Sequence, residues 1–232
     1  MRFVCLVFSI LGFVACAGTP TPVPPPVHQP AYYPSPVYGP LGDLRNPTQG
    51  PFQPNAELFV CYGGVSNAPP FDANGRVTNF NPIIFIDNQI AMASVPSNDV
   101  CLSSGYGLRN GRPHRGSDFA PYPRGEEREV YTAAPGMVRE ARTASGYGKY
   151  VVLDHGFGIY TRYAHLASID SWAVPGVEVG FGHRLGMMGE SGNARGVHLH
   201  FEVLMGDINT PKGSFGLETF DPLSFPAWPG IN

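Results

Sequence analysis

Short stretches of alternating apolar and polar residues fill the second half of the chain, and they constrain its fold most strongly. Glycine-containing turns separate them, and no helical periodicity longer than two or three turns lies between them. Short strands spaced this closely are typical of antiparallel sheets and sandwiches. We therefore predict a mostly β, antiparallel sheet or sandwich-like domain, with strands at 130–134, 136–144, 149–154, 158–165, 184–188 and 198–205.

The composition favours the same fold class. Of the 232 residues only 14 % are charged, whereas Gly (29) and Pro (25) are abundant and favour turns. The formal net charge is −3 at pH 7. Because there is no basic excess, nothing indicates nucleic acid as a partner.

The N-terminus has the features of an export signal. A basic start precedes an apolar run at 3–14 that is too short to span a membrane comfortably. We assign residues 1–16 to a lipoprotein-type signal peptide, with cleavage before Cys16 and a lipid anchor on its sulfur. Cleavage after Ala17, or retention as a membrane anchor, are the alternatives. All three predict an exported protein of the periplasm or cell envelope, and we favour the membrane-anchored lipoprotein.

The rest of the chain divides by composition. Residues 17–56 hold twelve of the prolines and only two charged residues, which predicts a polyproline-like linker or, alternatively, a ligand for a proline-binding module. Residues 57–100 predict an N-terminal β extension, with a strand at 58–62 and two strands around a turn at Asp87 and Asn88. Residues 101–232 form the predicted main domain.

Two cysteines remain once the predicted signal peptide is set aside. Cys61 and Cys101 are an even number in an oxidising compartment, so we predict a disulfide between them. The alternative, a zinc site, is weaker because they form no CxxC pair.

Histidines supply the candidate chemistry. His198 and His200 lie two apart on a predicted strand, so their side chains share one face. His114 and Asp118 form an imidazole–carboxylate pair, and His165 ends another strand. Together these residues offer three metal ligands and two further imidazoles, although each could separately be an ordinary surface residue. Three protein ligands with an open fourth position are typical of catalytic zinc, which activates water and polarises a carbonyl group.

The order of motifs resembles peptidase family M23, the LytM or lysostaphin type. The matching stretches are SGYGLR at 104–109, HRGSD at 114–118, YTAAPGMV at 131–138, GYGKYVVLDHG at 146–156, YAHL at 163–166, GESGNARGVHLHFE at 189–202 and DPL at 221–223.

The resemblance implies a mostly antiparallel β domain with one zinc ion per chain, held in a groove lined by long loops. It implies His114, Asp118 and His200 as zinc ligands. His165 and His198 would be the catalytic imidazoles, one a general base and the other an oxyanion stabiliser. Arg109, Tyr163 and Asn193 are candidates for the substrate groove, and Thr210 begins an insertion that runs to 220.

The implied function is a zinc metalloendopeptidase that hydrolyses peptide cross-links or stem peptides of peptidoglycan during cell-wall remodelling. Its partners would be peptidoglycan and, through the anchor on Cys16, the membrane. The alternative is a catalytically silent module of the same type that binds the wall or activates amidases. Residues 57–100 could produce that silence if Asn79, Asn81 or Asp87 occluded the groove as a fourth ligand.

Overall fold

The computed structural model describes residues 52–109 and 111–230, and all of these lie within one compact unit. The predicted signal peptide, Cys16 and positions 17–51 of the predicted linker lie outside the described residues. Within the described ranges, no helix is long and apolar enough to cross a membrane.

Strands make up almost all of the regular structure of the described residues. In chain order they are β1 (Ile83–Ile86), β2 (Ile90–Ala93), β3 (Val100–Ser104), β4 (Gly107–Arg109), β5 (Arg112–His114), β6 (Ser117–Pro121), β7 (Glu129–Tyr131), β8 (Gly136–Ala144), β9 (Gly148–Asp154), β10 (Ile159–Leu166), β11 (Ser168–Ile169), β12 (Glu178–Val179), β13 (Arg184–Met187), β14 (Leu199–Met205) and β15 (Glu218–Phe220). A short 3-10 helix, η2 (Gly213–Gly216), precedes β15. Five of the six predicted strands match to within one residue, and the prediction of a mostly β chain is confirmed.

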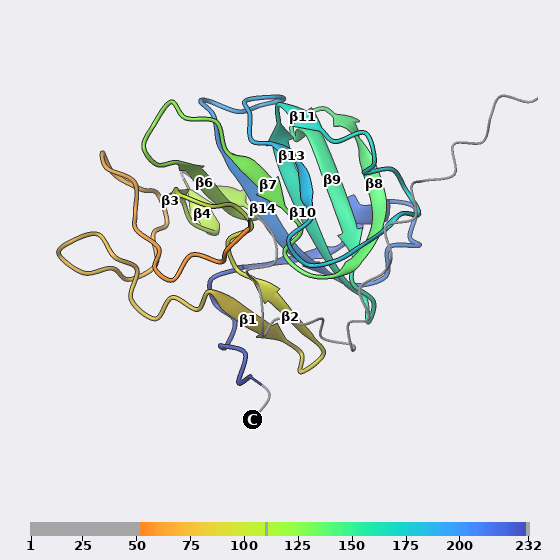
Figure 1. The fold of residues 1–232 in the computed structure, drawn as a ribbon, viewed down its shortest axis with the longest axis horizontal. Coiled ribbons are helices and arrows are strands. Elements are labelled where there is room, and N and C mark those ends of the chain that lie inside the picture. The colour runs from red at the N-terminus through yellow and green to blue at the C-terminus, as the bar shows by residue number, and fades with distance from the viewer. Residues whose placement is uncertain (1–51, 110, 231–232) are drawn as a thin grey trace, which may run out of the picture. The chain divides into compact units, whose positions relative to one another are not determined.

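An eight-stranded antiparallel sheet is the frame of the molecule (Figure 1). Its strands run in the order β12-β8-β9-β10-β14-β6-β3, and β15 pairs beside β14. Tight turns connect β8 to β9 and β9 to β10, and the first places Gly146 and Gly148 at φ values of +88° and +63°. Glycine adopts such values more readily than residues with a Cβ atom do.

The two faces of the sheet bury different sets of side chains. Val151, Tyr163 and Phe201 belong to the larger core cluster. Tyr150 and Ala164, which alternate with them along the same strands, belong to a smaller cluster on the other face. This follows from the two-residue repeat of a strand, whose successive side chains point to opposite faces.

A second, three-stranded sheet covers the larger cluster. Its order is β11-β13-β7. Val130 of β7 and Leu185 of β13 are fully buried in the same cluster as Phe201 of the main sheet. The antiparallel, sandwich-like arrangement predicted from the sequence is therefore present around this core.

The N-terminal extension packs onto the main sheet through several short contacts. Its hairpin β1–β2 turns at Asp87 and Asn88, as predicted, and both residues have positive φ. The Ala93 amide donates to the carbonyl of Ala133 in the main domain. The predicted strand at 58–62 is absent, because this stretch makes only isolated bridges at Phe59 and Val60.

The folded unit begins earlier than the composition indicates. The sequence assigns 52–56 to the linker, but Phe52 is 1 % exposed and stacks on Tyr131 with ring centroids 5.0 Å apart. The Asn55 side chain also donates to the carbonyl of Ser97. The structure therefore corrects this boundary, since 52–56 pack against the main domain.

The structure contains the disulfide predicted between Cys61 and Cys101. Its sulfurs are 2.01 Å apart and its Cα atoms 5.0 Å apart. Because Cys101 lies in β3, the bond joins the extension to the edge of the main sheet.

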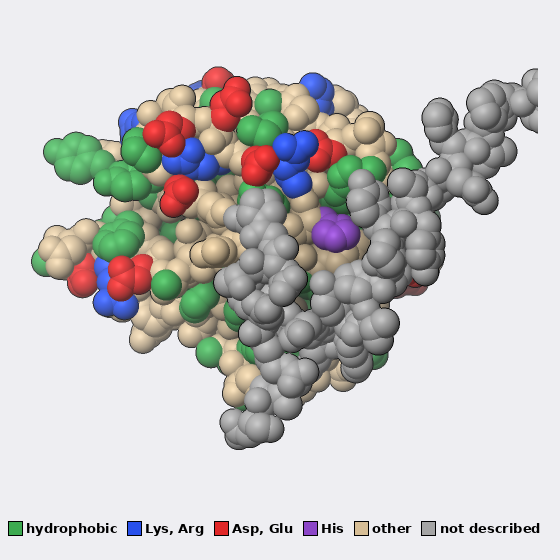
Figure 2. Space-filling view, in the orientation of Figure 1, with side chains coloured by type: hydrophobic (Ala, Val, Ile, Leu, Met, Phe, Trp, Pro, Cys, Tyr) green, Lys and Arg blue, Asp and Glu red, His purple; other side chains and the backbone are tan. Residues whose placement is uncertain are grey.

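Charges of both signs share the surface. On the face in Figure 2, acidic and basic side chains are interspersed across the upper part. Ion pairs such as Arg184 with Asp170 (2.8 Å) and with Glu129 (2.9 Å) show the same mixing. The described part of this face thus carries no large region of a single sign.

Candidate metal centre

Three strands bring the predicted metal ligands together. His200 on β14 stands directly opposite Asp118 on β6, and His114 ends β5 just before them. The chain turns between His114 and β6 at Gly116. A Cβ atom there would lie 2.3 Å from the carbonyl oxygen of Phe201, so glycine is needed for this close approach to β14.

The three ligand atoms form a small buried triangle. The His114 Nε2 atom lies 3.0 Å from Asp118 Oδ1 and 3.1 Å from His200 Nδ1, and the last two are 2.8 Å apart. Their residues are 5–6 % exposed. Within the described ranges this is the group of His, Cys, Asp and Glu side chains that could hold a metal ion.

This triangle fits zinc. Zinc bonds of about 2.0–2.1 Å in a tetrahedron separate ligand atoms by about 3.3 Å, close to the distances observed. Two imidazoles and one carboxylate are also a common zinc donor set.

The buried charges favour a cation at this point. Burial by itself would raise the pKa of Asp118, but the hydrogen bonds with His114 and His200 outweigh it and hold that pKa well below its ordinary value. Burial would lower the pKa of His200, whereas its contacts with Asp118 and Glu202 raise it to about 9. The carboxylate of Asp118 is therefore ionised, whereas His200 would have to release its proton to bind a metal ion.

A second set of contacts fixes the orientation of the two imidazoles predicted as ligands. The Nδ1 atom of His114 donates to the carbonyl of Gly105 at 2.7 Å. The Nε2 atom of His200 donates to Glu202 Oε1 at 3.0 Å. Each bond leaves the other ring nitrogen facing the triangle, which is how such contacts select the tautomer that binds metal.

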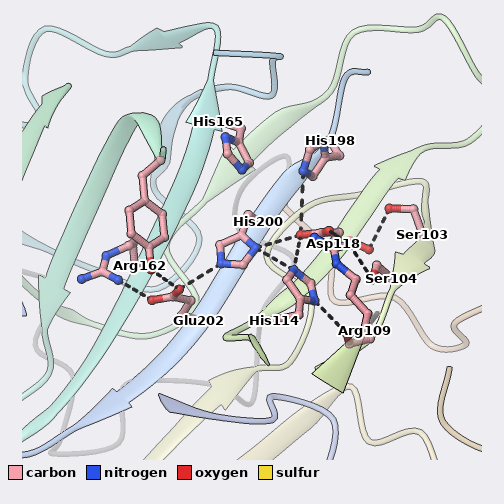
Figure 3. Close-up of polar contacts among 12 residues, drawn as sticks. Ser103, Ser104, Arg109, His114, Asp118, Arg162, His165, His198, His200 and Glu202 are labelled. Carbon is pink, nitrogen blue, oxygen red and sulfur yellow. Dashed lines mark hydrogen bonds and ion pairs between the residues drawn. The ribbon is translucent and has the colours of Figure 1, made fainter. Parts of the chain in front are cut away.

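Glu202 is itself part of a buried network that the sequence analysis missed. It accepts a hydrogen bond from Tyr147 and pairs with Arg162, which is 1 % exposed (Figure 3). The Arg162 guanidinium also donates to the carbonyl of Ser214 in η2, at 2.8 Å. Arg162 and Glu202 are cross-strand partners of opposite charge on β10 and β14, so a correct pairing of these two strands would have predicted the ion pair.

His165 is aimed at the triangle by an irregularity in β10. The pairing of β10 with β9 shifts register between Tyr163 and Leu166, and His165 has a φ of +63°. Its Nδ1 atom donates to the carbonyl of Ser191 at 2.8 Å. Burial lowers the pKa of His165 to about 4, so the ring is neutral at pH 7 and its Nε2 atom is the one available to accept a proton.

His198 lies beside His165 on the same side of the triangle (Figure 3). The two ring centroids are 4.8 Å apart, and His198 Nε2 is 3.8 Å from Asp118 Oδ1. The Nδ1 atom of His198 donates to the carbonyl of Gly196 at 2.9 Å. Leu199, between the two histidines of the motif, is fully buried in the core. The predicted common face of His198 and His200 is therefore present.

The three groove candidates lie in different places. Arg109 is half exposed, and its Nη1 atom lies 3.4 Å from Asp118 Oδ2, at the rim of the triangle. Asn193 is exposed in the loop that also holds Ser191, the partner of His165.

The structure contradicts the prediction that Tyr163 lines the substrate groove. It is fully buried and its hydroxyl accepts from the Ala133 amide. It faces the larger core cluster, on the side of the sheet opposite to His200.

This region is similar to known protein families. Residues 112–211 match the model of the family described as Peptidase family M23. The peptidoglycan DD-endopeptidase ShyA of Vibrio cholerae is 41 % identical over 93 residues, which are 40 % of this chain and 20 % of that protein. The DD-carboxypeptidase/endopeptidase Mpg of Neisseria meningitidis is 35 % identical over 98 residues, 41 % of this chain and 21 % of that protein. The chain thus spans about a fifth of these relatives.

Solved structures also match. A zinc-containing peptidase from Vibrio cholerae aligns with a TM-score of 0.45 and 26 % identity, over 64 % of this chain and 40 % of that one. The catalytic domain of lysostaphin from Staphylococcus simulans aligns with a TM-score of 0.45 and 25 % identity, over 54 % and 90 %.

Proposed function

We propose, because residues 112–211 match the model of peptidase family M23, that the chain belongs to this family and is a zinc-dependent endopeptidase of peptidoglycan. It would hydrolyse peptide cross-links or stem peptides and so remodel the cell wall. The observation that carries this proposal is the buried triangle of His114, Asp118 and His200, with His165 and His198 together on one side of it.

The residues of the site would have three different roles, namely metal binding, proton transfer and orientation of the ligand rings. His114, Asp118 and His200 would hold one zinc ion, which as a Lewis acid activates water and polarises the scissile carbonyl. The Nδ1 atoms of His165 and His198 donate to backbone carbonyls, so each Nε2 atom would be free to accept a proton. A ring that carries a second proton on Nε2 would instead donate to a developing oxyanion. Gly105 and Glu202 keep the ligand rings in the tautomers required.

The nature of the relatives supports the substrate. ShyA is a peptidoglycan DD-endopeptidase and Mpg a DD-carboxypeptidase/endopeptidase. We therefore take a cross-link between stem peptides as the first substrate to test.

Export would bring the domain to this substrate. Its support is the apolar N-terminal run, the lipid-anchor candidate Cys16 and the proline-rich spacer, which would tether the domain at a distance from the membrane.

Within the described part of the chain, the contacts of the three residues that could occlude the groove do not favour the catalytically silent module. Asn81 donates its side-chain amide to the carbonyl of Phe225. Asp87 is exposed in the β1–β2 turn, and Asn79 is exposed beside Glu57 and Arg76. These side chains are occupied or placed elsewhere, so a fourth ligand from them is not supported.

The test combines metal content with hydrolysis of purified sacculi. The wild type should bind one zinc per chain and release muropeptides whose masses identify the bond cut. His200→Ala should lose zinc and activity together. His165→Ala and His198→Ala should keep most of the zinc and lose turnover by about 10²-fold or more.

His183→Ala provides the matched control, because His183 lies outside the triangle and beside Trp172. It should keep both zinc and activity. If His200→Ala retains zinc at the wild-type level, His200 is not a zinc ligand and the proposed metal site is wrong. A fully loaded wild type that leaves sacculi intact would instead establish the silent module.

A further inference from the structure

A segment of the N-terminal extension runs along the outer edge of β3. We call residues 59–67 the edge segment. The Leu102 amide donates to the carbonyl of Phe59 at 2.8 Å, and the Cys61 amide donates back to Leu102 at 2.9 Å. The disulfide from Cys61 to Cys101 fastens the segment at this end.

The other end of the edge segment lies against Gly105. The Gly105 amide donates to the carbonyl of Ser66 at 2.8 Å. A Cβ atom on Gly105 would lie 1.9 Å from the carbonyl oxygen of Asn67 and 2.9 Å from its carbonyl carbon. Both are backbone atoms, so relief of such an overlap requires movement of the chain itself. The edge segment therefore sits in direct contact with Gly105.

Gly105 connects this contact to the metal triangle. Its carbonyl oxygen accepts a hydrogen bond from His114 Nδ1 at 2.7 Å, while its amide donates to the carbonyl of Ser66. The backbone of Gly105 is thus held on one side by the extension and on the other by a proposed metal ligand. A shift of the edge segment would be passed to the His114 ring through one residue.

The strand beside the edge segment also supports Asp118. The Ser103 hydroxyl donates to the backbone carbonyl of Asp118 at 3.1 Å. The side chain of Ser104 accepts from Arg109, whose guanidinium lies 3.4 Å from Asp118 Oδ2. Two of the three proposed ligands therefore depend on β3 and its continuation.

We propose that the edge segment, fastened by the Cys61–Cys101 disulfide, is a positioning element for the metal ligand His114. This inference rests on the proposed metal role of His114, Asp118 and His200. It assigns the extension a task at the metal site, where it sets the affinity for zinc. Contacts that orient ligand imidazoles typically change metal affinity by about 10- to 100-fold when they are lost.

A purely structural role is the competing explanation. Covering β3 protects an exposed sheet edge from pairing with other chains. Loss of that cover would lower the stability of the protein and leave the zinc affinity of the folded molecules unchanged. The experiment must therefore measure the metal site separately from the fold.

The first variant is Gly105→Ala in the full chain. The added methyl group should displace the Gly105 carbonyl and weaken zinc binding by about 10-fold or more, measured by competition with a fluorescent chelator. The visible absorption spectrum of the Co²⁺-substituted protein should change as well, because it reports on the ligands themselves. Circular dichroism confirms that the variant is folded.

The matched control is Gly136→Ala. A Cβ atom there would lie 2.6 Å from the carbonyl oxygen of Asp154 and 2.8 Å from His155 Nδ1. This substitution also creates an overlap with backbone, but at the pairing of β8 with β9 and away from the triangle. It should lower stability and leave the zinc affinity and the Co²⁺ spectrum of the folded protein unchanged.

The second variant covers the case in which Gly105→Ala does not fold. Replacement of both cysteines, Cys61→Ser with Cys101→Ser, releases the fastened end without adding volume. We expect zinc affinity to fall by at least severalfold, with the secondary structure retained.

The outcomes separate this inference from the proposed function. Zinc affinity within twofold of wild type in the folded variants would overturn the positioning role, as would an equal loss in Gly136→Ala. If the wild type binds no zinc, or if His200→Ala binds it equally well, the metal site itself is refuted and this inference with it.

Discussion

At the residue scale, a single bulge in β10 turns His165 toward the triangle of His114, Asp118 and His200. Regular alternation would put Tyr163 and His165, two residues apart, on the same face of β10. Tyr163 does face the larger core, beside Phe201, but the register shift and the positive φ of His165 turn the histidine toward His200. Bulges often re-aim a side chain next to a functional site in this way.

This explains which parts of the site the sequence could predict. His198 and His200 follow from simple strand alternation, and the motif order supplies His114 and Asp118. The placement of Tyr163 in the groove was wrong because no pattern in YAHL reveals a bulge. Arg162 was missed because its partner, Glu202, is identified only by the register of two strands.

Glu202→Gln tests the support behind His200. Glutamine keeps the shape, but it removes the charge that pairs with Arg162 and weakens the acceptor for His200 Nε2. We expect zinc affinity to fall by about 10- to 100-fold. The free energy of unfolding should fall by about 3–5 kcal/mol, because Arg162 is left buried and unpaired. Chelator competition and urea unfolding measure the two effects.

Glu140→Gln is the control for that substitution. Glu140 on β8 accepts from Tyr150 and pairs with Arg142, and it has no contact with the three ligands. Its replacement should leave zinc affinity unchanged. Equal affinities in the wild type and Glu202→Gln would mean that Glu202 does not orient His200.

At the element scale, the sequence predicted strand positions well and their connections poorly. Glycine turns mark the ends of β8, β9 and β10, so their bounds were accessible. The stretch at 58–62 has strand composition but forms only isolated bridges, since its partners are β3 and a distant loop. Such long-range pairing is set by the tertiary fold and leaves no local pattern.

His155 joins three of these elements from inside the fold. It is 8 % exposed, its Nδ1 atom donates to the carbonyl of Pro135 just before β8, and its Nε2 atom lies within hydrogen-bond distance, 2.8 Å, of the Thr161 hydroxyl on β10. Burial lowers the pKa of His155 to about 4. The unfolded chain, with a pKa of about 6.5, therefore binds the proton at a higher pH than the folded protein does.

The stability of the protein therefore falls as the pH falls through this range. The neutral ring contributes stability that is fully present above about pH 6.5 and is lost as the pH falls toward 4. The loss from this one residue amounts to about 3 kcal/mol. His155→Gln should be less stable than the wild type at pH 7, but its free energy of unfolding should fall less between pH 6.5 and 4. Parallel curves for the two proteins, from urea unfolding at each pH, would contradict this role.

At the scale of the whole molecule, the main domain and the extension share one core. Phe52, Leu58 and Ile84 from the extension belong to the same buried cluster as Phe201 of the main sheet. Composition could not reveal this, because Phe52 stands in a proline-rich stretch and its partners Tyr131 and Phe181 are far along the chain. A boundary drawn from local composition therefore falls inside the folded unit.

Phe52→Ala measures how firmly the start of the folded unit is held. Removing a ring that is 1 % exposed leaves a cavity against Tyr131 and Phe181. The free energy of unfolding should fall by about 3–5 kcal/mol. Urea unfolding at a fixed zinc concentration gives the value, because bound metal adds to apparent stability.

Phe71→Ala makes the same chemical change on the same extension, where the ring is 50 % exposed. It should cost less than about 1 kcal/mol. Because the ring of Phe52 contacts Tyr131 and Phe181, Phe52→Ala should also leave the zinc affinity of the folded protein at the wild-type value. If Phe52→Ala leaves the midpoint of urea unfolding unchanged, residues 52–56 do not stabilise the folded unit and belong to the linker, as the composition indicated. A loss of zinc affinity equal to that of Gly105→Ala would mean that the extension acts on the metal site as one rigid piece, and not through the edge segment alone.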